Sequence, residues 1–209
     1  MPIITSIKPQ RNGRRVNVYL DGAFGFGIDL DNLVLSGIKI NKEFTEEEVE
    51  KIIKKAEFQK TWEKLLKFAS LRPRSEKEIK DWFRRKKVHE SLHKDLFNRL
   101  KYLDLIDDHK FAEWWVEQRI TFKPKGKRAL TMELREKGIK KEVINQVLAD
   151  SPIDEEKMAK ELLAKNAYKW ERLPNLKAKQ KMSEFLLRKG FSWEIVKKIV
   201  RIDQNGEME

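Results

Sequence analysis

The sequence predicts a mainly α-helical protein, an elongated array of three tandem three-helix repeats preceded by a small N-terminal antiparallel β-rich segment. Two observations lead to this fold class. Strand-type patterns and hairpin signals occur only before residue 29, whereas the periodic segments after residue 45 follow the helical spacing. The helical part also repeats itself about every 51 residues, a period typical of units that bury their apolar faces by stacking on one another.

The opening segment, residues 3–28, contains β-rich runs separated by turn signals. The tripeptide Arg-Asn-Gly at 11–13 joins the first two runs, and Asn-Gly is a strong signal for a short hairpin. Asp-Gly at 21–22 forms a second turn before Phe24 and Phe26. We therefore expect a small antiparallel meander in this segment.

Capping signals mark the helices that follow. A short helix-like stretch, Leu-Asp-Asn-Leu-Val-Leu-Ser, ends at Gly37. Thr45 and Glu48 then have the spacing of a capping box, in which the hydroxyl and the carboxylate each accept a backbone N–H, and they open a helical pattern that runs toward Ser70.

A second capping box, Ser75 with Glu78, predicts that another helix begins at Glu76. Its residues Ile79, Trp82 and Phe83 form one apolar face, and the run Arg-Arg-Lys-Lys lies at its C-terminal end, where the helix dipole favours cations. The dipole does not explain the cations that precede this helix.

The internal repeat is read from coinciding apolar positions. Shifts of 51 and then 52 residues superimpose the second and third helices of successive units, and the first helices align at slightly different offsets. Each unit is therefore three helices. The aligned second helices carry Ile79, Phe83 and Val88, then Leu130, Leu134 and Ile139, then Met182, Leu186 and Phe191; the first helices carry Leu65 and Phe68, Ala112 and Trp115, and Ala159 and Leu162.

We place the domain boundaries from these patterns. The β-rich N-terminal segment covers residues 1–58, the three repeats cover 59–106, 107–150 and 151–203, and a disordered tail covers 204–209. The N-terminal segment is expected to be separable, because the net charge of the chain lies entirely beyond it.

The first helix of the middle repeat is apolar over about 200° of its circumference, roughly twice the stripe of a surface helix, so it must be packed on two sides. Trp115 is expected in its core, and Trp82 and Trp193 in or near the cores of the other units. Trp114 lies at the margin of the apolar arc and is a candidate contact aromatic. The arc consists of Phe111, Ala112, Trp114, Trp115, Val116 and Phe122.

Composition limits the possible functions. The net charge is +12 and the isoelectric point about 9.7, and the charge is 0 over residues 1–59 but +7 over 60–106. Such a distribution indicates an anionic partner, either a polyanion or an acidic protein surface. The absence of cysteine excludes disulfides, thiol catalysis and thiolate zinc sites. No apolar run is long enough to span a membrane and no secretory signal is evident, so we expect a cytosolic protein without membrane contact.

One catalytic motif appears at face value. His89, Glu90 and His93 satisfy H-E-x-x-H, in which two imidazoles one turn apart bind zinc and the Glu acts as general base. The positions of the metzincin continuation hold Leu96 and Arg99 instead of glycine and histidine, so zinc hydrolysis remains a remote alternative. No phosphate-binding loop or Ser/His/Asp set is present, and we expect neither an enzyme nor a cofactor.

Basic clusters recur at equivalent places before the second helix of each unit. Stacked units would align them as a cationic edge for a periodic anionic partner, whereas the alternative is ordinary solvated loops. As exposed loop charges, Arg72 and Arg74 would be replaceable without loss of thermal stability. The candidate edge comprises Arg72, Arg74, Arg84 and Arg85 in the first unit, Lys123, Lys125, Lys127 and Arg128 in the second, and Lys177 and Lys179 in the third.

Several of these segments resemble the RecX regulatory proteins of bacteria. They are Arg-Pro-Arg-Ser-Glu-Lys-Glu-Ile at 72–79, the Asp-Asp step at 107–108 into Phe-Ala at 111–112, the connection 119–126, and Met-Glu-Leu-Arg-Glu-Lys-Gly-Ile at 132–139. The resemblance runs from about residue 60 to 203, and the opening strands are similar to those of longer relatives. It implies a non-enzymatic protein that binds the RecA filament on DNA and mostly inhibits its assembly, ATP hydrolysis and strand exchange, in DNA recombination, DNA repair and the SOS response. The main alternative is a helical-repeat protein that binds nucleic acid directly.

Overall fold

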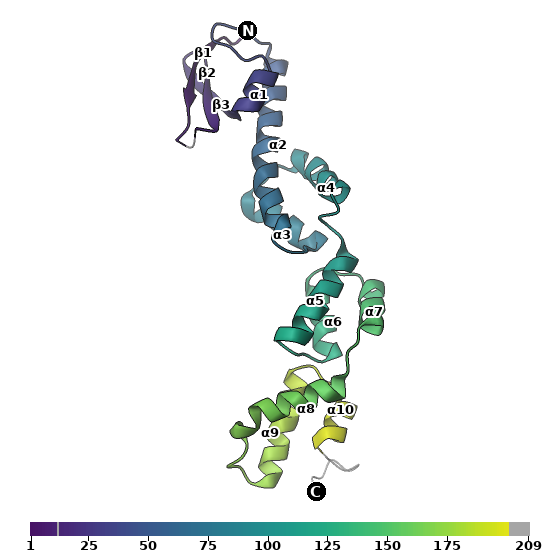
Figure 1. Ribbon diagram of the computed structural model, residues 1–209. Helices are drawn as coiled ribbons and strands as arrows, with labels where there is room; N and C mark the ends of the chain where they lie inside the picture. The colour runs from purple at the N-terminus through teal and green to yellow at the C-terminus, as the bar shows by residue number, and fades with distance from the viewer. Residues whose placement is uncertain (12, 201–209) are drawn as a thin grey trace. The chain divides into compact units, whose positions relative to one another are not determined.

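The structure is a computed structural model that describes residues 1–11 and 13–200. The described chain is mainly helical after an N-terminal three-stranded antiparallel sheet, which confirms the predicted fold class (Figure 1). Its backbone contacts divide it into two compact units. These compact units are not the three-helix repeats of the sequence analysis. Unit one comprises Met1–Leu71 with Lys87–Tyr102, and unit two comprises Arg72–Lys86 with the chain from Leu103 onward.

The sheet of unit one is the expected meander. Its strands are β1 (Ile4–Pro9), β2 (Arg15–Leu20) and β3 (Ala23–Asp29), in the order β1-β2-β3 with both pairings antiparallel. The predicted turn at 21–22 is present, with both residues at positive φ. The other predicted turn includes Asn12, which lies outside the described residues.

Helices α1 (Leu30–Leu35) and α2 (Glu46–Ser70) cover this sheet. The capping box of Thr45 and Glu48 is formed as predicted, with both reciprocal hydrogen bonds. Along α2, Val49 and Ala56 belong to the core of the sheet, whereas Trp62 and Leu65 are buried further along the same helix. The expected boundary between residues 58 and 59 therefore falls inside a continuous helix.

A 3-10 turn (Glu90–Leu92) and α4 (His93–Tyr102) complete unit one. The guanidinium of Arg99 lies 4.5 Å from the centre of the Trp62 ring, which joins α4 to α2. Leu96 and Leu100 of α4 are fully buried, as expected of the apolar face of a third helix.

Unit two contains the other helices. They are α3 (Glu76–Lys86), α5 (Asp108–Phe122), α6 (Lys127–Glu136), α7 (Lys141–Asp150), α8 (Glu155–Asn166), α9 (Asn175–Arg188) and α10 (Trp193–Val200), with a 3-10 turn at Ala167–Lys169. Helices α5–α7 bury one apolar core and α8–α10 a second. Ile120 and Ile153 pack against both cores, so these two repeats share an apolar junction.

The repeat is visible in equivalent hydrogen bonds at successive helix N-termini. The backbone N–H of Glu76 donates to the Asp108 carboxylate, and that of Lys127 donates to Glu155, each over 2.9 Å. Next to these bonds, the Ser75 hydroxyl donates to the backbone carbonyl of Lys137 over 2.8 Å. The donor and acceptor positions of the first two bonds are 51 and 47 residues apart, which are the offsets of the sequence repeat.

Glycine is required where two repeats touch. The N–H of Gly126 donates to the carbonyl of Lys189 over 2.9 Å, and a Cβ atom added at Gly126 would lie 2.2 Å from the carbonyl oxygen of Gly190. Gly190 itself has φ +83°, and a Cβ there would lie 2.3 Å from the Cβ of Ala129. No side chain fits such a contact, and only glycine adopts that φ without strain.

Two aromatic residues expected near a core are exposed. Phe122 is 71% exposed because it is the last residue of α5, and Trp193 is 42% exposed at the first residue of α10. Both lie in terminal turns, beyond the part of the helix that covers the core. By contrast, Trp82 is 4% exposed and confirms its predicted core position.

Candidate partner-binding surface

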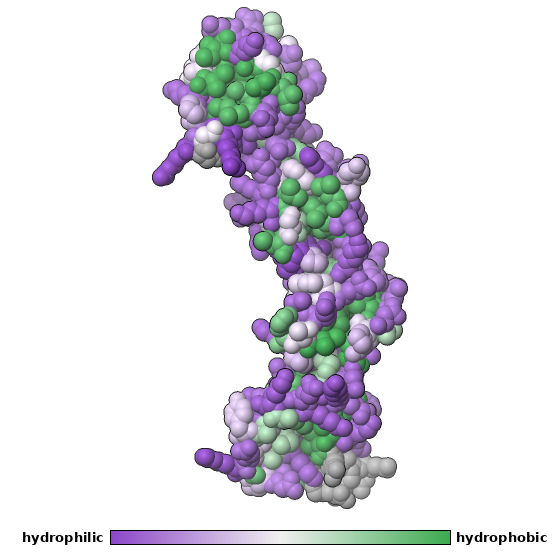
Figure 2. Space-filling view, viewed as in Figure 1, coloured by the Kyte–Doolittle hydropathy of each residue, from purple (hydrophilic) through white to green (hydrophobic). Residues whose placement is uncertain are grey.

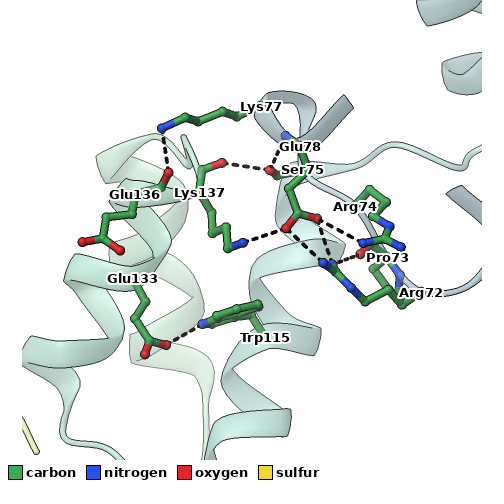
Figure 3. Close-up of polar contacts among 10 residues, drawn as sticks. All are labelled: Arg72, Pro73, Arg74, Ser75, Lys77, Glu78, Trp115, Glu133, Glu136 and Lys137. Carbon is green, nitrogen blue, oxygen red and sulfur yellow. Dashed lines mark hydrogen bonds and ion pairs between the residues drawn. The ribbon is translucent and has the colours of Figure 1, made fainter. Parts of the chain in front are cut away.

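The carboxylate of Glu78, in the first turn of α3, is surrounded by cations (Figure 3). Arg72 donates to both of its oxygens, over 2.8 and 3.0 Å, in the bidentate geometry of the strongest charge-assisted pairs. Lys137, just after α6, donates over 2.7 Å, and Arg74 lies 3.8 Å away. The capping hydroxyl of Ser75 accepts the N–H of Glu78, so the predicted helix start is confirmed, while the Glu78 carboxylate binds these side chains.

Electrostatics keep this buried group ionised. Burial alone would raise the pKa of the Glu78 carboxyl, but hydrogen bonds from Arg72 and Lys137 outweigh burial and hold that pKa below its ordinary value. Burial and then the neighbouring Arg72 lower the pKa of Arg74, which the Glu78 charge partly offsets. Removal of the carboxylate would leave several cations close together without their shared acceptor.

Glu133 on α6 is a second acceptor of the same kind. Its carboxylate accepts from Trp115 Nε1 over 2.8 Å, from Arg119 Nε over 2.7 Å and from the ammonium of Lys125. Burial would raise the pKa of Glu133, but the hydrogen bonds from Lys125, Arg119 and Trp115 together lower it. The indole of Trp115 therefore has its polar atom satisfied while its ring remains in contact with the protein interior.

Cations also lie against the faces of the tryptophans on α5. The guanidinium of Arg119 lies 4.4 Å, and the ammonium of Lys137 5.0 Å, from the centre of the Trp115 ring. Arg72 lies 5.2 Å from the centre of the Trp114 ring. Such distances are typical of cation–π contacts. We refer to the group formed by Arg72, Arg74, Glu78, Trp114, Trp115, Arg119, Lys125, Glu133 and Lys137 as the cation–aromatic cluster.

The structure changes the interpretation of part of the predicted basic edge. Arg74 is only 8% exposed, which contradicts its expected place as a solvated loop charge. Arg72 and Lys125 are half-buried, each with a carboxylate partner inside the cluster. The physical reason is the presence of Glu78 and Glu133, which draw these side chains inward. The role of the three cations in partner binding stays a prediction.

The other predicted cations are exposed or half-buried. Lys127 and Lys179 are half-buried, and the backbone N–H of Lys127 is the donor to Glu155 described above. Lys177 and Lys179 lie within α9, not before it, because that helix begins at Asn175 directly after Pro174. The exposed members, here called the exposed cations, are Arg84, Arg85, Lys123, Arg128 and Lys177.

Trp114, the predicted contact aromatic, is half-buried. Its ring lies 6.0 Å from that of Phe111 and 6.1 Å from that of Trp115, and it packs at the margin of the α5–α7 core and against Arg72. Trp115 is also half-buried against that core, with its ring stacked 5.7 Å from Phe111. Sequence reasoning missed Glu78 and Glu133 as acceptors for these cations, and the repeat did not reveal them, because the offset of 51 residues maps Glu78 onto Ala129.

The zinc motif does not have the geometry that its chemistry requires. His89 precedes the 3-10 turn and accepts the N–H of Ser91, whereas His93 begins α4 and its Nε2 lies 2.9 Å from the carbonyl of Val88. The two imidazoles are therefore not one turn apart on a continuous α-helix. Over residues 1–11 and 13–200, no group of three or more His, Cys, Asp or Glu residues could hold a metal ion.

Exposed apolar side chains occur in both units. Figure 2 shows a hydrophobic area over the N-terminal sheet and α1, where Val34 and Leu35 are 77% and 75% exposed. None of the helices in the described ranges has both the length and the apolar composition needed to cross a membrane.

Comparisons with known proteins agree with this organisation. Family models match residues 2–45 as the N-terminal domain of regulatory protein RecX, residues 107–148 as the second three-helix domain of RecX, and residues 154–200 as the third. Regulatory protein RecX of Bacillus licheniformis is 33% identical over 198 residues, which cover 94% of this chain and 75% of that protein. Regulatory protein RecX of Clostridium perfringens is 31% identical over 208 residues, with 98% and 97% covered.

Solved structures give the same result. A crystal structure of regulatory protein RecX superimposes with a TM-score of 0.68 and 26% identity, covering 97% of this chain and 100% of that one. The structure of RecX from Lactobacillus salivarius gives a TM-score of 0.60, also at 26% identity, over 69% of this chain and 95% of that one. The chain belongs to the RecX family of regulatory proteins.

Proposed function

We propose that this protein is a non-enzymatic regulator that binds the RecA filament on DNA and mostly inhibits its assembly, its ATP hydrolysis and its strand exchange. The observation that carries the proposal is family membership over nearly the whole chain, since relatives named regulatory protein RecX align over 94% and 98% of it. In this role the protein acts in recombination and DNA repair, including the SOS response, in the cytoplasm where chromosomal DNA lies.

The placement of charge supports an anionic partner surface. The exposed cations come from α3, from the loop after α5, from α6 and from α9 of unit two. Their removal costs the folded protein little, whereas they would contribute to long-range attraction by a filament that contains DNA. The cation–aromatic cluster has a different task in this proposal, because its carboxylates hold the start of α3 against α5 and α6.

Direct binding to nucleic acid is the second candidate, favoured by the net charge of +12. Binding of this kind releases counterions, so its affinity falls steeply as salt rises. Binding to a protein surface also depends on shape complementarity and apolar contacts, so its affinity falls less steeply as salt rises.

The two candidates are separated by one binding experiment. The labelled protein is titrated with single-stranded DNA and with the same DNA coated by the cognate RecA and a non-hydrolysed nucleotide, at low and at physiological salt. We expect tighter binding to the coated DNA at both salt concentrations. Equal or weaker binding to coated DNA, lost at physiological salt, would contradict the proposal and support the second candidate.

A further inference from the structure

Unit two contains a groove of opposite charge to the rest of the chain. It has a volume of about 400 Å³ and lies between α5, the end of α7 and the residues that lead to α8. Val116, Ile120 and Val147 form its apolar floor. Glu113, Glu117 and Asp150, all exposed, form its rim.

The residues that line the groove include three carboxylates and no Lys or Arg. On a chain with a net charge of +12, this is a locally anionic surface. Glu113 and Glu117 are one helical turn apart on the same face of α5, so their charges add in one direction. His109 lies one turn before Glu113 on α5, and its Nδ1 is 3.6 Å from a carboxylate oxygen of Glu113.

This chemistry excludes one class of occupant and favours another. DNA phosphates would meet three like charges, an arrangement that is unfavourable for association. An ammonium or guanidinium group would be attracted by the same carboxylates, and an apolar side chain would cover the accessible surface of Ile120 and Pro152. The groove is therefore complementary to a protein segment that carries an apolar residue flanked by Lys or Arg.

We infer that this groove docks a basic, apolar-anchored segment of a protein partner, which, resting on the proposed function, is a segment of the RecA subunit. The apolar anchor lies on Ile120 and Pro152, which line the groove, and its flanking cations pair with the rim carboxylates. Ile120 packs against both apolar cores of unit two, so the occupant binds where two repeats meet. In this inference the groove contacts the RecA subunit, and the exposed cations, which lie outside the groove, attract the negative charge of the filament.

Charge reversal at the rim tests the inference, because it should weaken binding to a basic protein segment and strengthen binding to nucleic acid. In the variant Glu113→Lys/Glu117→Lys, binding to RecA-coated DNA should weaken about tenfold or more, which corresponds to roughly 1.4 kcal/mol. The matched control Glu161→Lys/Glu171→Lys makes the same charge change at two exposed positions outside the groove. The control should bind coated DNA at least as well as the unmodified chain, and both variants should bind bare DNA more tightly.

A steric variant makes the test independent of charge. Thr121 is an exposed residue at the groove, and Thr121→Trp should fill part of it and weaken binding to coated DNA while leaving bare-DNA binding unchanged. Circular dichroism verifies that each variant is folded.

The outcomes separate the inference from the function on which it rests. If the unmodified chain does not prefer coated DNA, the proposed function fails and the inference fails with it. If the unmodified chain prefers coated DNA but the groove variants bind it like the control, the inference is overturned and the proposed function stands. If the charge-reversed groove variant binds coated DNA more tightly than the control does, the occupant of the groove is nucleic acid, and the inference is also overturned.

Discussion

At the scale of single residues, Glu78 and Glu133 are the acceptors around which the cation–aromatic cluster forms. Their side chains are 12% and 16% exposed, and each accepts hydrogen bonds from at least two cations or polar groups. A carboxylate in such a position contributes mainly by preventing its cationic neighbours from remaining unpaired, and less by the net strength of any one pair.

Replacement of Glu78 by Gln is therefore expected to lower the free energy of unfolding by about 1–3 kcal/mol. The amide keeps the shape of the carboxyl group but leaves Arg72, Arg74 and Lys137 without a shared negative charge. Urea denaturation followed by circular dichroism measures the effect. The control Glu161→Gln, at an exposed position, should change stability by no more than about 0.5 kcal/mol. Equal stability of the two variants would show that the cluster does not hold α3 in place.

The same carboxylates predict a pH dependence whose direction is fixed. The folded-state pKa of Glu78 and of Glu133 lies below the ordinary value of 4.5, so the stability that they contribute is fully present above that pH. It is lost as the pH falls through the folded-state pKa values. We expect the stability difference between the unmodified chain and Glu78→Gln/Glu133→Gln to be constant near neutral pH and to shrink in acid. A difference that stays constant down to pH values well below 4.5 would contradict the assigned shifts.

The roles of the individual arginines could be predicted only in part. Sequence shows that Arg72 and Arg74 precede a helix whose dipole does not stabilise them, and this led to the prediction that they contact a partner, which stays a prediction. It could not show that Glu78 turns back toward them or that Lys137, 59 residues away, reaches the same carboxylate. The expectation that their removal leaves the melting temperature unchanged therefore no longer follows, because Arg74 is buried.

At the scale of elements, the junctions between repeats rest on close backbone approach. Gly126 has ordinary φ but no room for a side chain, whereas Gly190 has both a positive φ and no room. Gly22, in the turn between β2 and β3, has φ +84° and open space around its Cα. Substitutions at these three glycines therefore separate the free-energy cost of a left-handed backbone from the cost of a steric clash.

Alanine substitutions should rank accordingly. Gly22→Ala carries only the cost of a left-handed conformation, about 1–2 kcal/mol. Gly126→Ala should cost more, because the new methyl group meets backbone atoms that cannot move aside, and Gly190→Ala should cost most. Thermal unfolding of the three variants tests this order. If Gly126→Ala is as stable as the unmodified chain, the contact between Gly126 and Gly190 is not as close as the structure has it.

Element positions were largely readable from local signals. The hairpin residues before β3, the capping box of α2 and the start of α3 all appear in the structure as predicted, because each depends on side chains within a few residues of one another. Phe122 and Trp193 were misplaced because periodicity gives the face of a residue but not how far along the helix the core extends. Periodicity alone does not show the short 3-10 turn at Glu90–Leu92 that precedes α4.

At the scale of the whole molecule, the cations differ in their surroundings. Those of the cluster are held by internal carboxylates, whereas the exposed cations lie at the surface, where Arg84 pairs with Asp81 over 2.9 Å. We propose that the exposed cations attract the partner. The repeat and the family were evident in the sequence, since they depend on spacing along the chain. The acidic groove was not, because its lining comes from α5, from the end of α7 and from residues 151–152, which meet only after folding.

Removal of exposed cations should therefore affect binding and not stability. Arg85→Ala/Lys123→Ala/Arg128→Ala should keep the melting temperature and should weaken binding to RecA-coated DNA, most strongly at low salt. The control Lys141→Ala/Lys160→Ala/Lys165→Ala removes equal charge from other exposed positions. Titrations of both variants at several salt concentrations measure the difference. Identical affinity of the two variants would mean that net charge alone, and not its placement, attracts the partner.

The most direct measurement of the proposed function is the rate of ATP hydrolysis by preformed filaments of the cognate RecA on single-stranded DNA, as this protein is added in increasing amounts. Excess bare DNA is included in a parallel series, so that an effect through DNA alone is recognised by its relief. We predict that hydrolysis falls in a saturable manner and that bare DNA does not restore it. A hydrolysis rate that stays constant while the protein is bound, or one that excess DNA fully restores, would contradict the account of this chain as a regulator of the filament.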